Sequence, residues 1–251
     1  DTTDVMIDEE TGRLIREGIP TILNPFDMYA LELALRHRDE FPGTEVLVFS
    51  IGPPHAERNL REVIAMGADE VYLITDPAFA GADTYATSYT LAAAIKSIGG
   101  IDLILTGKQA IDGDTAQVGP GIAEWLDIPQ VTFVKAIREL GGGRAIVERS
   151  TESGYEVVEV CLPALLTIVK SEFDPRLPTL RGFIKAKETP IKKLTSRDLP
   201  IDESKIGLSG SPTRVVKVFT PERRKKCEFI SGNAREVVQK MLKKLRDKQI
   251  L

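Results

Sequence analysis

Apolar residues in the first half of the chain recur at two alternating spacings, which predict helices and strands in turn. The run Asn24-Pro25-Phe26-Asp27 is a helix start signal, because Asn suits the N-cap, Pro the first helical position and Asp the first turn. Compact apolar runs at residues 45–51, 71–75 and 103–106 indicate buried strands. Amphipathic stretches at residues 55–66 and 84–98 indicate helices between them.

Strands and helices that alternate through short connections favour right-handed crossovers and a parallel sheet covered on both faces. The sequence therefore predicts a doubly wound α/β fold with a mainly parallel sheet. Such a sheet normally opens with a buried strand, whereas this sequence opens with the polar run Asp-Thr-Thr-Asp. We therefore expect a first strand that is missing from the sequence, and a short hairpin at residues 4–15.

The pattern changes beyond residue 128. Consecutive strand-like runs predict an antiparallel extension or edge of the sheet, at residues 130–134, 145–149, 155–161 and 164–169. From residue 174 Pro is frequent and periodicity disappears until a helix expected at residues 234–248. A long segment without its own core usually packs on something else, so we expect an extended C-terminal arm that wraps a partner and ends in a partner-docked helix. The expected regions are an α/β domain at 1–190, the arm at 191–232 and the terminal helix at 233–251.

Charge divides the chain into an acidic body and a basic tail. The net charge is −4, but residues 1–175 carry 13 basic and 29 acidic side chains (−16), whereas residues 176–251 carry 20 and 8 (+12). A basic tail could hold a polyanion, but no aromatic residues alternate with its charges as a nucleic-acid stacking platform would require. The pattern favours a solvated or partner-binding arm, and no nucleic-acid partner is expected.

Apolar run lengths and cysteine content narrow the class of protein further. The longest apolar runs, such as residues 162–169, fall far short of the roughly 18 residues of a membrane span. No signal segment opens the sequence, so we expect a cytoplasmic protein without a membrane span. Cys161 and Cys227 are too few for a disulfide framework and lack the spacing of a zinc site, so no metal is expected.

Motifs for common chemistries are missing from the sequence. It contains no P-loop, no dinucleotide-type glycine motif, no zinc-protease helix and no nucleophile elbow. His37 and His55 suit a polar helix face and a helix start better than a catalytic role. We expect no catalytic residue.

Loops that follow predicted strands are the candidate ligand sites, because open α/β sheets bind ligands at strand ends. The longest leaves the strand at 103–106 and enters a helix through small, polar and glycine residues, whose backbone amides could approach a phosphate. A plain polar turn is the alternative, but the length of the loop favours a function. Its residues are Gly107, Lys108, Gln109, Ala110, Ile111, Asp112, Gly113, Asp114, Thr115, Ala116, Gln117 and Val118.

Two shorter segments could complete the site. Asp83, Thr84, Thr87 and Ser88 stand at a helix start and suit a pyrophosphate, although composition alone favours simple capping of the helix. The third candidate segment consists of two stretches, Asn24, Pro25, Phe26 and Asp27 with Ser50 and Ile51. Together they could close around a nucleobase or ribose, but both stretches also suit the ordinary ends of a helix and a strand.

At these residues the sequence resembles the beta subunit of electron transfer flavoprotein. The shared segments are NPFD at Asn24, VFSIGP at Val48, AMGAD at Ala65, GKQAIDGDTAQ at Gly107 and LPALLTIVKSEFDPRLPTLRGFIKAKETPI from Leu162 to Ile191. The match covers most of the chain. It implies an adenine-nucleotide-binding α/β fold and a heterodimer with an alpha subunit.

The resemblance also bears on the nucleotide. Ordinary members hold structural AMP in the beta subunit, whereas the electron-bifurcating group holds FAD there and oxidises NADH. The segment ADTYATS at Ala82 resembles the FAD-pyrophosphate segment of the second group, as does SGYEVVEVCLPALLTIVK for its signature. The resemblance thus implies FAD held through Asp83, Thr84, Thr87 and Ser88, with residues 109–118 at the ribose and phosphate and the third segment at the adenosine.

Partners follow from the same resemblance. Electrons would pass to ferredoxin or flavodoxin and, through FAD of the alpha subunit, to an acyl-CoA dehydrogenase-type enzyme. Residues 175–187 resemble the loop that recognises this dehydrogenase, with Leu177 and Leu180 as anchors in a basic frame that includes Arg176 and Arg181. The competing hypotheses are an AMP-binding electron carrier of the same family and a nucleotide-binding regulatory module without a redox role.

Overall fold

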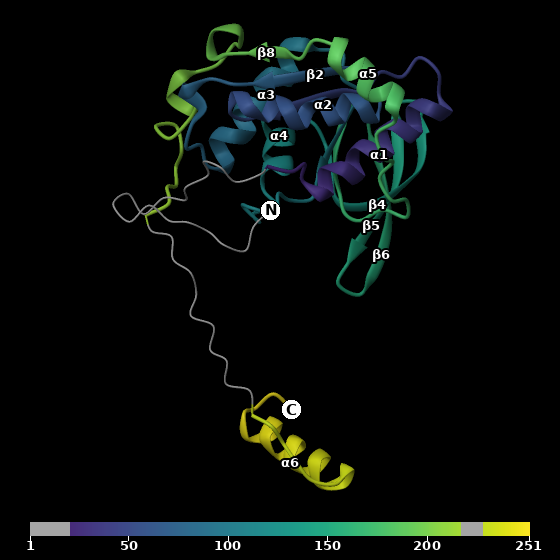
Figure 1. The fold of residues 1–251 in the computed structure, drawn as a ribbon, viewed down its shortest axis with the longest axis vertical. Helices are drawn as coiled ribbons and strands as arrows, with labels where there is room; N and C mark the ends of the chain where they lie inside the picture. The colour runs from purple at the N-terminus through teal and green to yellow at the C-terminus, as the bar shows by residue number, and fades with distance from the viewer. Residues whose placement is uncertain (1–20, 217–227) are drawn as a thin grey trace. The chain divides into compact units, whose positions relative to one another are not determined.

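A computed structural model of the chain describes residues 21–216 and 228–251 (Figure 1). The hairpin expected at residues 4–15 lies outside the described residues. The chain divides into two compact units, and the described parts of these units are residues 21–216 and 228–251. Each unit is therefore considered by itself.

Helices and strands alternate through the first half of the larger unit as the hydrophobic spacing predicts. The elements are α1 Pro25–Glu40, β1 Leu47–Ile51, α2 Glu57–Met66, β2 Glu70–Ile74, α3 Thr84–Ile98, β3 Leu103–Gly107 and α4 Val118–Leu126. Short 3-10 turns at Pro54–Ala56 and Pro77–Phe79 lead into α2 and α3. The expected bounds of α3 agree with the structure, and the other bounds differ by a few residues.

Parallel pairing confirms the expected α/β class. β1, β2 and a short β8, Lys192–Leu194, form one parallel sheet. The second sheet has the order β3-β7-β4-β5-β6, with β4 Gln130–Gly141, β5 Arg144–Thr151, β6 Gly154–Cys161 and β7 Ala164–Ile168. β3, β7 and β4 are parallel, whereas β4, β5 and β6 are antiparallel and form the expected extension.

Strand β7 shows why helices cover both faces of this sheet. Successive side chains of a strand point to opposite faces. Leu166 and Ile168 belong to the core cluster that contains Leu33 of α1, whereas Leu165 belongs to the cluster that contains Ile122 of α4. All five residues of β7 are buried. The fold is therefore doubly wound, with α1 on one face of β7 and α4 on the other.

Two segments beyond residue 174 differ from the sequence-based expectation. Residues expected as a loop contain helix α5, Leu180–Glu188, which Thr179 caps by accepting a hydrogen bond from the Gly182 amide. Its apolar residues largely face outward, so no core-facing stripe reveals the helix. Residues expected in the arm up to 216 belong to the body, because β8 pairs with β2, and Leu199 and Ile206 are buried in a cluster with Ile74.

The terminal helix is present where the sequence predicts it. α6 spans Ala234–Asp247 and begins with a capping box between Asn233 and Glu236. Its exposed apolar residues are Val238, Met241 and Leu242. None of the helices in the described parts of the chain has the length and apolar character needed to cross a membrane.

Glycine at the crossing of α3 and α4 generates the first prediction. A Cβ at Gly121 would lie 2.6 Å from Oγ and 2.8 Å from Cβ of the buried Ser88. We expect Gly121→Ala to lower the free energy of unfolding by about 1–3 kcal/mol through overpacking. Gly113→Ala, where the added Cβ meets nothing within 4 Å, is the control. Urea unfolding measures both variants, and equal stability of the two would contradict the prediction.

Candidate functional site

A cleft of about 910 Å³ lies between β1 and β3 and is lined by every residue of both strands. Within the described residues β1 pairs only with β2, and β3 only with β7, so each strand turns its other edge to this cleft. Leu33 of α1 and Leu91 of α3 also line it. The cleft thus has apolar walls along the strands and a polar end where the loops meet.

Eleven of the residues proposed from the sequence line this cleft together. They are Asp27, Ser50, Ile51, Thr87, Gly107, Gln109, Ala110, Thr115, Ala116, Gln117 and Val118. All three loop segments contribute to the set. The topology therefore brings the three segments to one end of the cleft, as expected for strand ends in an open α/β sheet.

The long loop is fastened to the start of α1. Asn24 Nδ2 donates to the Gln109 carbonyl oxygen at 2.9 Å, and the Ile111 amide donates to Asn24 Oδ1 at 3.3 Å. The Gly107 amide donates to Asp27 Oδ1 at 2.6 Å. Asn24 occupies the N-cap position of α1 but makes no side-chain cap. Its side chain holds the loop instead.

Gly107 allows this joint to close. A Cβ at this position would lie 2.7 Å from Cβ of Phe26 and 2.8 Å from the backbone nitrogen of Asp27. Any larger residue would push the start of α1 away from the end of β3. Neither Pro25 nor Phe26 is among the residues that line the cleft.

Backbone amides are the main donors at the far end of the loop. Asp114 and Ala116 have positive φ angles of 51° and 54°, whereas Gln117, the N-cap of α4, is right-handed. No side chain caps α4, and its first turn carries no acidic residue. An uncapped helix start with positive partial charge suits a phosphate.

The four residues proposed for a pyrophosphate stand at the start of α3, but they do not all reach the cleft. Thr87 lines the cleft, and Thr84 Oγ1 lies 3.0 Å from Gln117 Oε1, which joins α3 to the long loop. Ser88 is buried, and its hydroxyl donates to the Tyr85 carbonyl oxygen. Of the four, only Thr87 therefore lines the cleft, and Thr84 holds Gln117 beside it.

Asp83 has a structural task at the same helix start. Its Oδ1 accepts from the Ala86 amide at 3.1 Å, and its Oδ2 accepts from the amide and hydroxyl of Thr213 at 2.9 and 2.8 Å. Burial raises the pKa of this carboxyl, but these hydrogen bonds outweigh burial and hold the pKa below its usual value. Asp83 thus caps α3 and fastens the segment that contains Thr213.

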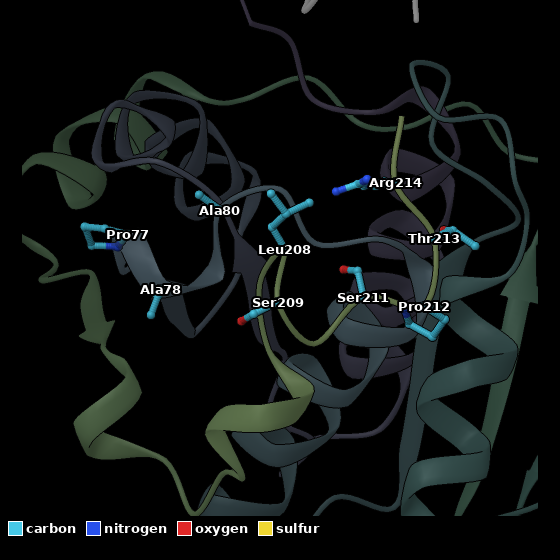
Figure 2. Close-up of a pocket in the computed structure, with 9 residues that line it drawn as sticks. All are labelled: Pro77, Ala78, Ala80, Leu208, Ser209, Ser211, Pro212, Thr213 and Arg214. Carbon is cyan, nitrogen blue, oxygen red and sulfur yellow. The ribbon is translucent and has the colours of Figure 1, made fainter. Parts of the chain in front are cut away.

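A second hollow, of about 690 Å³, is lined in part by the segment that contains Thr213. Figure 2 shows Ser209, Ser211, Thr213 and Arg214 around this hollow, opposite Pro77 and Ala78. The Asp83 amide lies 2.8 Å from Ser211 Oγ. The segment therefore belongs to the wall beside the start of α3.

Lys108 belongs to the predicted loop, but no role in ligand binding was predicted for it. It lines the cleft, and its Nζ lies 4.9 Å from the centre of the Phe26 ring. Among the lining residues of the described chain it alone is a Lys or Arg; the acidic ones are Asp27, Glu45 and Asp102. Sequence reasoning looked to amides for phosphate binding and therefore passed over a lysine in the middle of the same loop.

The residues proposed for a dehydrogenase partner do not share one environment. Leu177 and Leu180 are 84% and 79% exposed, and Arg181 is also exposed. Arg176 is less exposed and pairs with Glu32 and Asp39 of α1. Among residues 21–216 and 228–251, no group of three His, Cys, Asp or Glu side chains is placed to hold a metal ion.

Known proteins resemble this chain over its whole length. Residues 11–199 match the family described as Electron transfer flavoprotein domain. The chain is 50% identical over 252 residues to Electron transfer flavoprotein subunit beta of Thermoanaerobacterium thermosaccharolyticum, with 100% of this chain and 96% of that protein covered.

Two further relatives carry names that mention a complex. The chain is 51% identical over 252 residues to Caffeyl-CoA reductase-Etf complex subunit CarD of Acetobacterium woodii. It is 42% identical over 258 residues to Acryloyl-CoA reductase electron transfer subunit gamma of Anaerotignum propionicum. Both alignments cover 100% of this chain and 96% of the relative.

The cap at α3 generates a prediction that depends on pH. Because the pKa of Asp83 is lowered in the folded chain, its contribution is present above the unfolded value of 3.8 and is lost as the pH falls through the folded value. We expect Asp83→Ala to lower the free energy of unfolding at pH 7 by about 1–2 kcal/mol. In urea unfolding the difference from the unaltered chain should shrink below pH 4. If Asp83→Ala lowered the free energy of unfolding equally at pH 7 and below pH 4, the assignment of Asp83 as an ionised cap of α3 would be contradicted.

Proposed function

We propose, because this chain belongs to the electron transfer flavoprotein family and matches its beta subunits, that it pairs with an alpha subunit and binds FAD through the loops that meet at the polar end of the cleft, beyond the ends of β1 and β3. In this proposal NADH reduces that FAD, and the electrons divide between ferredoxin or flavodoxin and, through FAD of the alpha subunit, an acyl-CoA dehydrogenase-type enzyme. Two relatives are named as subunits that serve acyl-CoA reductases. We also propose a cytoplasmic location, which the cysteine usage supports.

The observation that carries the nucleotide proposal is the convergence of three loop segments on one end of the cleft. There Lys108, the Thr87 hydroxyl and the uncapped start of α4 stand within one site. These are donors to phosphate, and they suit an anion better than a neutral ligand.

An unpaired polar atom supports the fit. Thr106 Oγ1 is buried beside α4 and has no hydrogen-bond partner within the described residues. Thr106 also lines the cleft. A buried hydroxyl without a partner costs free energy, and a polar ligand group at the start of α4 would supply the partner.

This chain positions the nucleotide and does no bond-making itself. FAD would supply the redox chemistry, accepting two electrons as a hydride from NADH and releasing them one at a time. Thr87 would donate to the pyrophosphate, Thr84 would hold Gln117 in place, and Lys108 would offset the charge of the phosphates. The amides of residues 109–118 would hold ribose and phosphate. Asp27, Ser50 and Ile51 would lie at the adenosine end, with Asn24 holding the loop closed.

Cofactor content separates this proposal from its alternatives. We expect the purified heterodimer, saturated with FAD, to release two FAD on denaturation and to bleach at the flavin absorption band when NADH is added. One FAD together with one AMP would establish the AMP-binding carrier instead. A heterodimer that NADH does not reduce, and that delivers electrons to no dehydrogenase, would support a regulatory module.

Thr87 tests the placement of the pyrophosphate. We expect Thr87→Val to weaken FAD retention by about tenfold, because one hydrogen bond to a charged group contributes about 1.5 kcal/mol or more. Thr151→Val, on β5 and outside the lining of the cleft, is the matched control. Equilibrium dialysis against FAD measures both heterodimers. Equal retention in the two variants would remove Thr87 from the site.

A further inference from the structure

Four apolar side chains around the start of α5 are exposed. Leu177, Leu180, Phe183 and Ile184 are 84%, 79%, 48% and 55% exposed, and we call them the docking face. Residues 180, 183 and 184 share one side of a helix because of their spacing. Under the proposed function, on which this inference rests, the docking face contacts the acyl-CoA dehydrogenase-type enzyme.

Helix α5 is held firmly against the body beneath this face. A Cβ at Gly182 would lie 2.0 Å from the Ala65 carbonyl oxygen, so α5 and α2 are in backbone contact. At the other end, Arg61 donates to the carbonyl oxygens of Ala186 and Thr189. These contacts fix α5 itself but not Leu177, which lies before the helix begins.

Leu177 depends on a different anchor, the preceding Arg176. The Arg176 amide donates to Glu32 Oε2 at 3.0 Å, and its Nε donates to the same oxygen at 2.8 Å. Two further nitrogens of the guanidinium donate, Nη1 to Asp39 Oδ2 at 2.9 Å and Nη2 to Glu32 Oε1 at 3.2 Å. Backbone and side chain of Arg176 are therefore both bound to α1, directly beside the most exposed residue of the docking face.

Glu32 carries most of this anchor. Its side chain is 2% exposed and also accepts from Arg36 Nε at 2.9 Å. Burial raises the pKa of Glu32, but the hydrogen bonds and charge of Arg176, with the charge of Arg36, hold it below the usual value. Arg36 in turn lies 3.7 Å above the centre of the Phe173 ring. Residues 173–176 are thus tied to α1 from both ends.

We infer that Glu32 is a positioning residue for docking: through Arg176 it holds Leu177 where α5 presents the rest of the docking face. Glu32 is buried and does not touch the partner. Arg176 acts within the chain, with its guanidinium directed to Glu32 and Asp39. The anchors of the docking face are the apolar side chains, and the exposed Arg181 supplies charge at its edge.

The test compares Glu32→Gln with the unaltered heterodimer in electron delivery to the dehydrogenase. We expect KM for the flavoprotein to rise about tenfold, with kcat and nucleotide content unchanged, because the docking face is displaced while the cleft is not. Glu156→Gln is the matched control, since it removes an exposed carboxylate paired with Arg149 on the β5–β6 hairpin. An unchanged KM for Glu32→Gln would overturn the inference, as would loss of nucleotide together with kcat.

A double-mutant cycle with Arg176→Gln separates an internal anchor from a direct contact. If Glu32 and Arg176 act as a unit, the double variant should raise KM no more than either single change. Additive effects, or a much larger effect of Arg176→Gln alone, would show that Arg176 contacts the partner and would overturn the inference. Arg176→Lys keeps the charge but loses the planar set of guanidinium N–H donors. It should give an intermediate KM and disturb folding less than Arg176→Gln.

The proposed function fails by a different result. If the unaltered heterodimer delivers no electrons to the dehydrogenase, the proposed function is wrong. If the unaltered heterodimer is active and Glu32→Gln behaves in the same way, only the role of Glu32 is wrong.

Discussion

The structure depends on the close approach of the start of α1 to the end of β3. Gly107 permits the approach because it has no Cβ, and a Cβ at this position would collide with Phe26. The Gly107 amide donates a hydrogen bond to Asp27. From that contact Asn24 reaches the long loop and holds its backbone. These few atoms keep the loop beside α1, where its residues line the polar end of the cleft.

The charge of the body is consistent with this construction. An acidic domain that is proposed to hold a phosphate needs donors that carry little formal charge, and it uses amides, hydroxyls and a helix start. Lys108 is the single Lys or Arg among the described residues that line the cleft. Asp83, at the start of α3, has its carboxylate oxygens occupied by the α3 cap and by Thr213.

Much of the fold could be predicted from hydrophobic spacing, because α2, α3 and β2 bury a regular stripe or run and because β1 and β3 are compact apolar runs. Helix α5 could not, since Leu180 and Phe183 face solvent and the residues that fix it, Gly182 and Arg61, act through backbone contacts. The site loops could be located from their glycines and polar residues. Which side chains reach the cleft could not, because Ser88 and Thr87 differ only in the face of one helix that they occupy.

Helix α1 contacts both the long loop of the candidate site and the segment that precedes the docking face. Its first turn holds the long loop through Asn24 and Asp27, and Glu32 and Asp39 further along hold the segment before the docking face. Sixteen residues of helix span about 24 Å as a stiff rod. If the proposed nucleotide stabilises α1 on binding, the same helix would stabilise the segment before the docking face. By thermodynamic reciprocity, a docked partner would then raise the affinity for the nucleotide by the same factor.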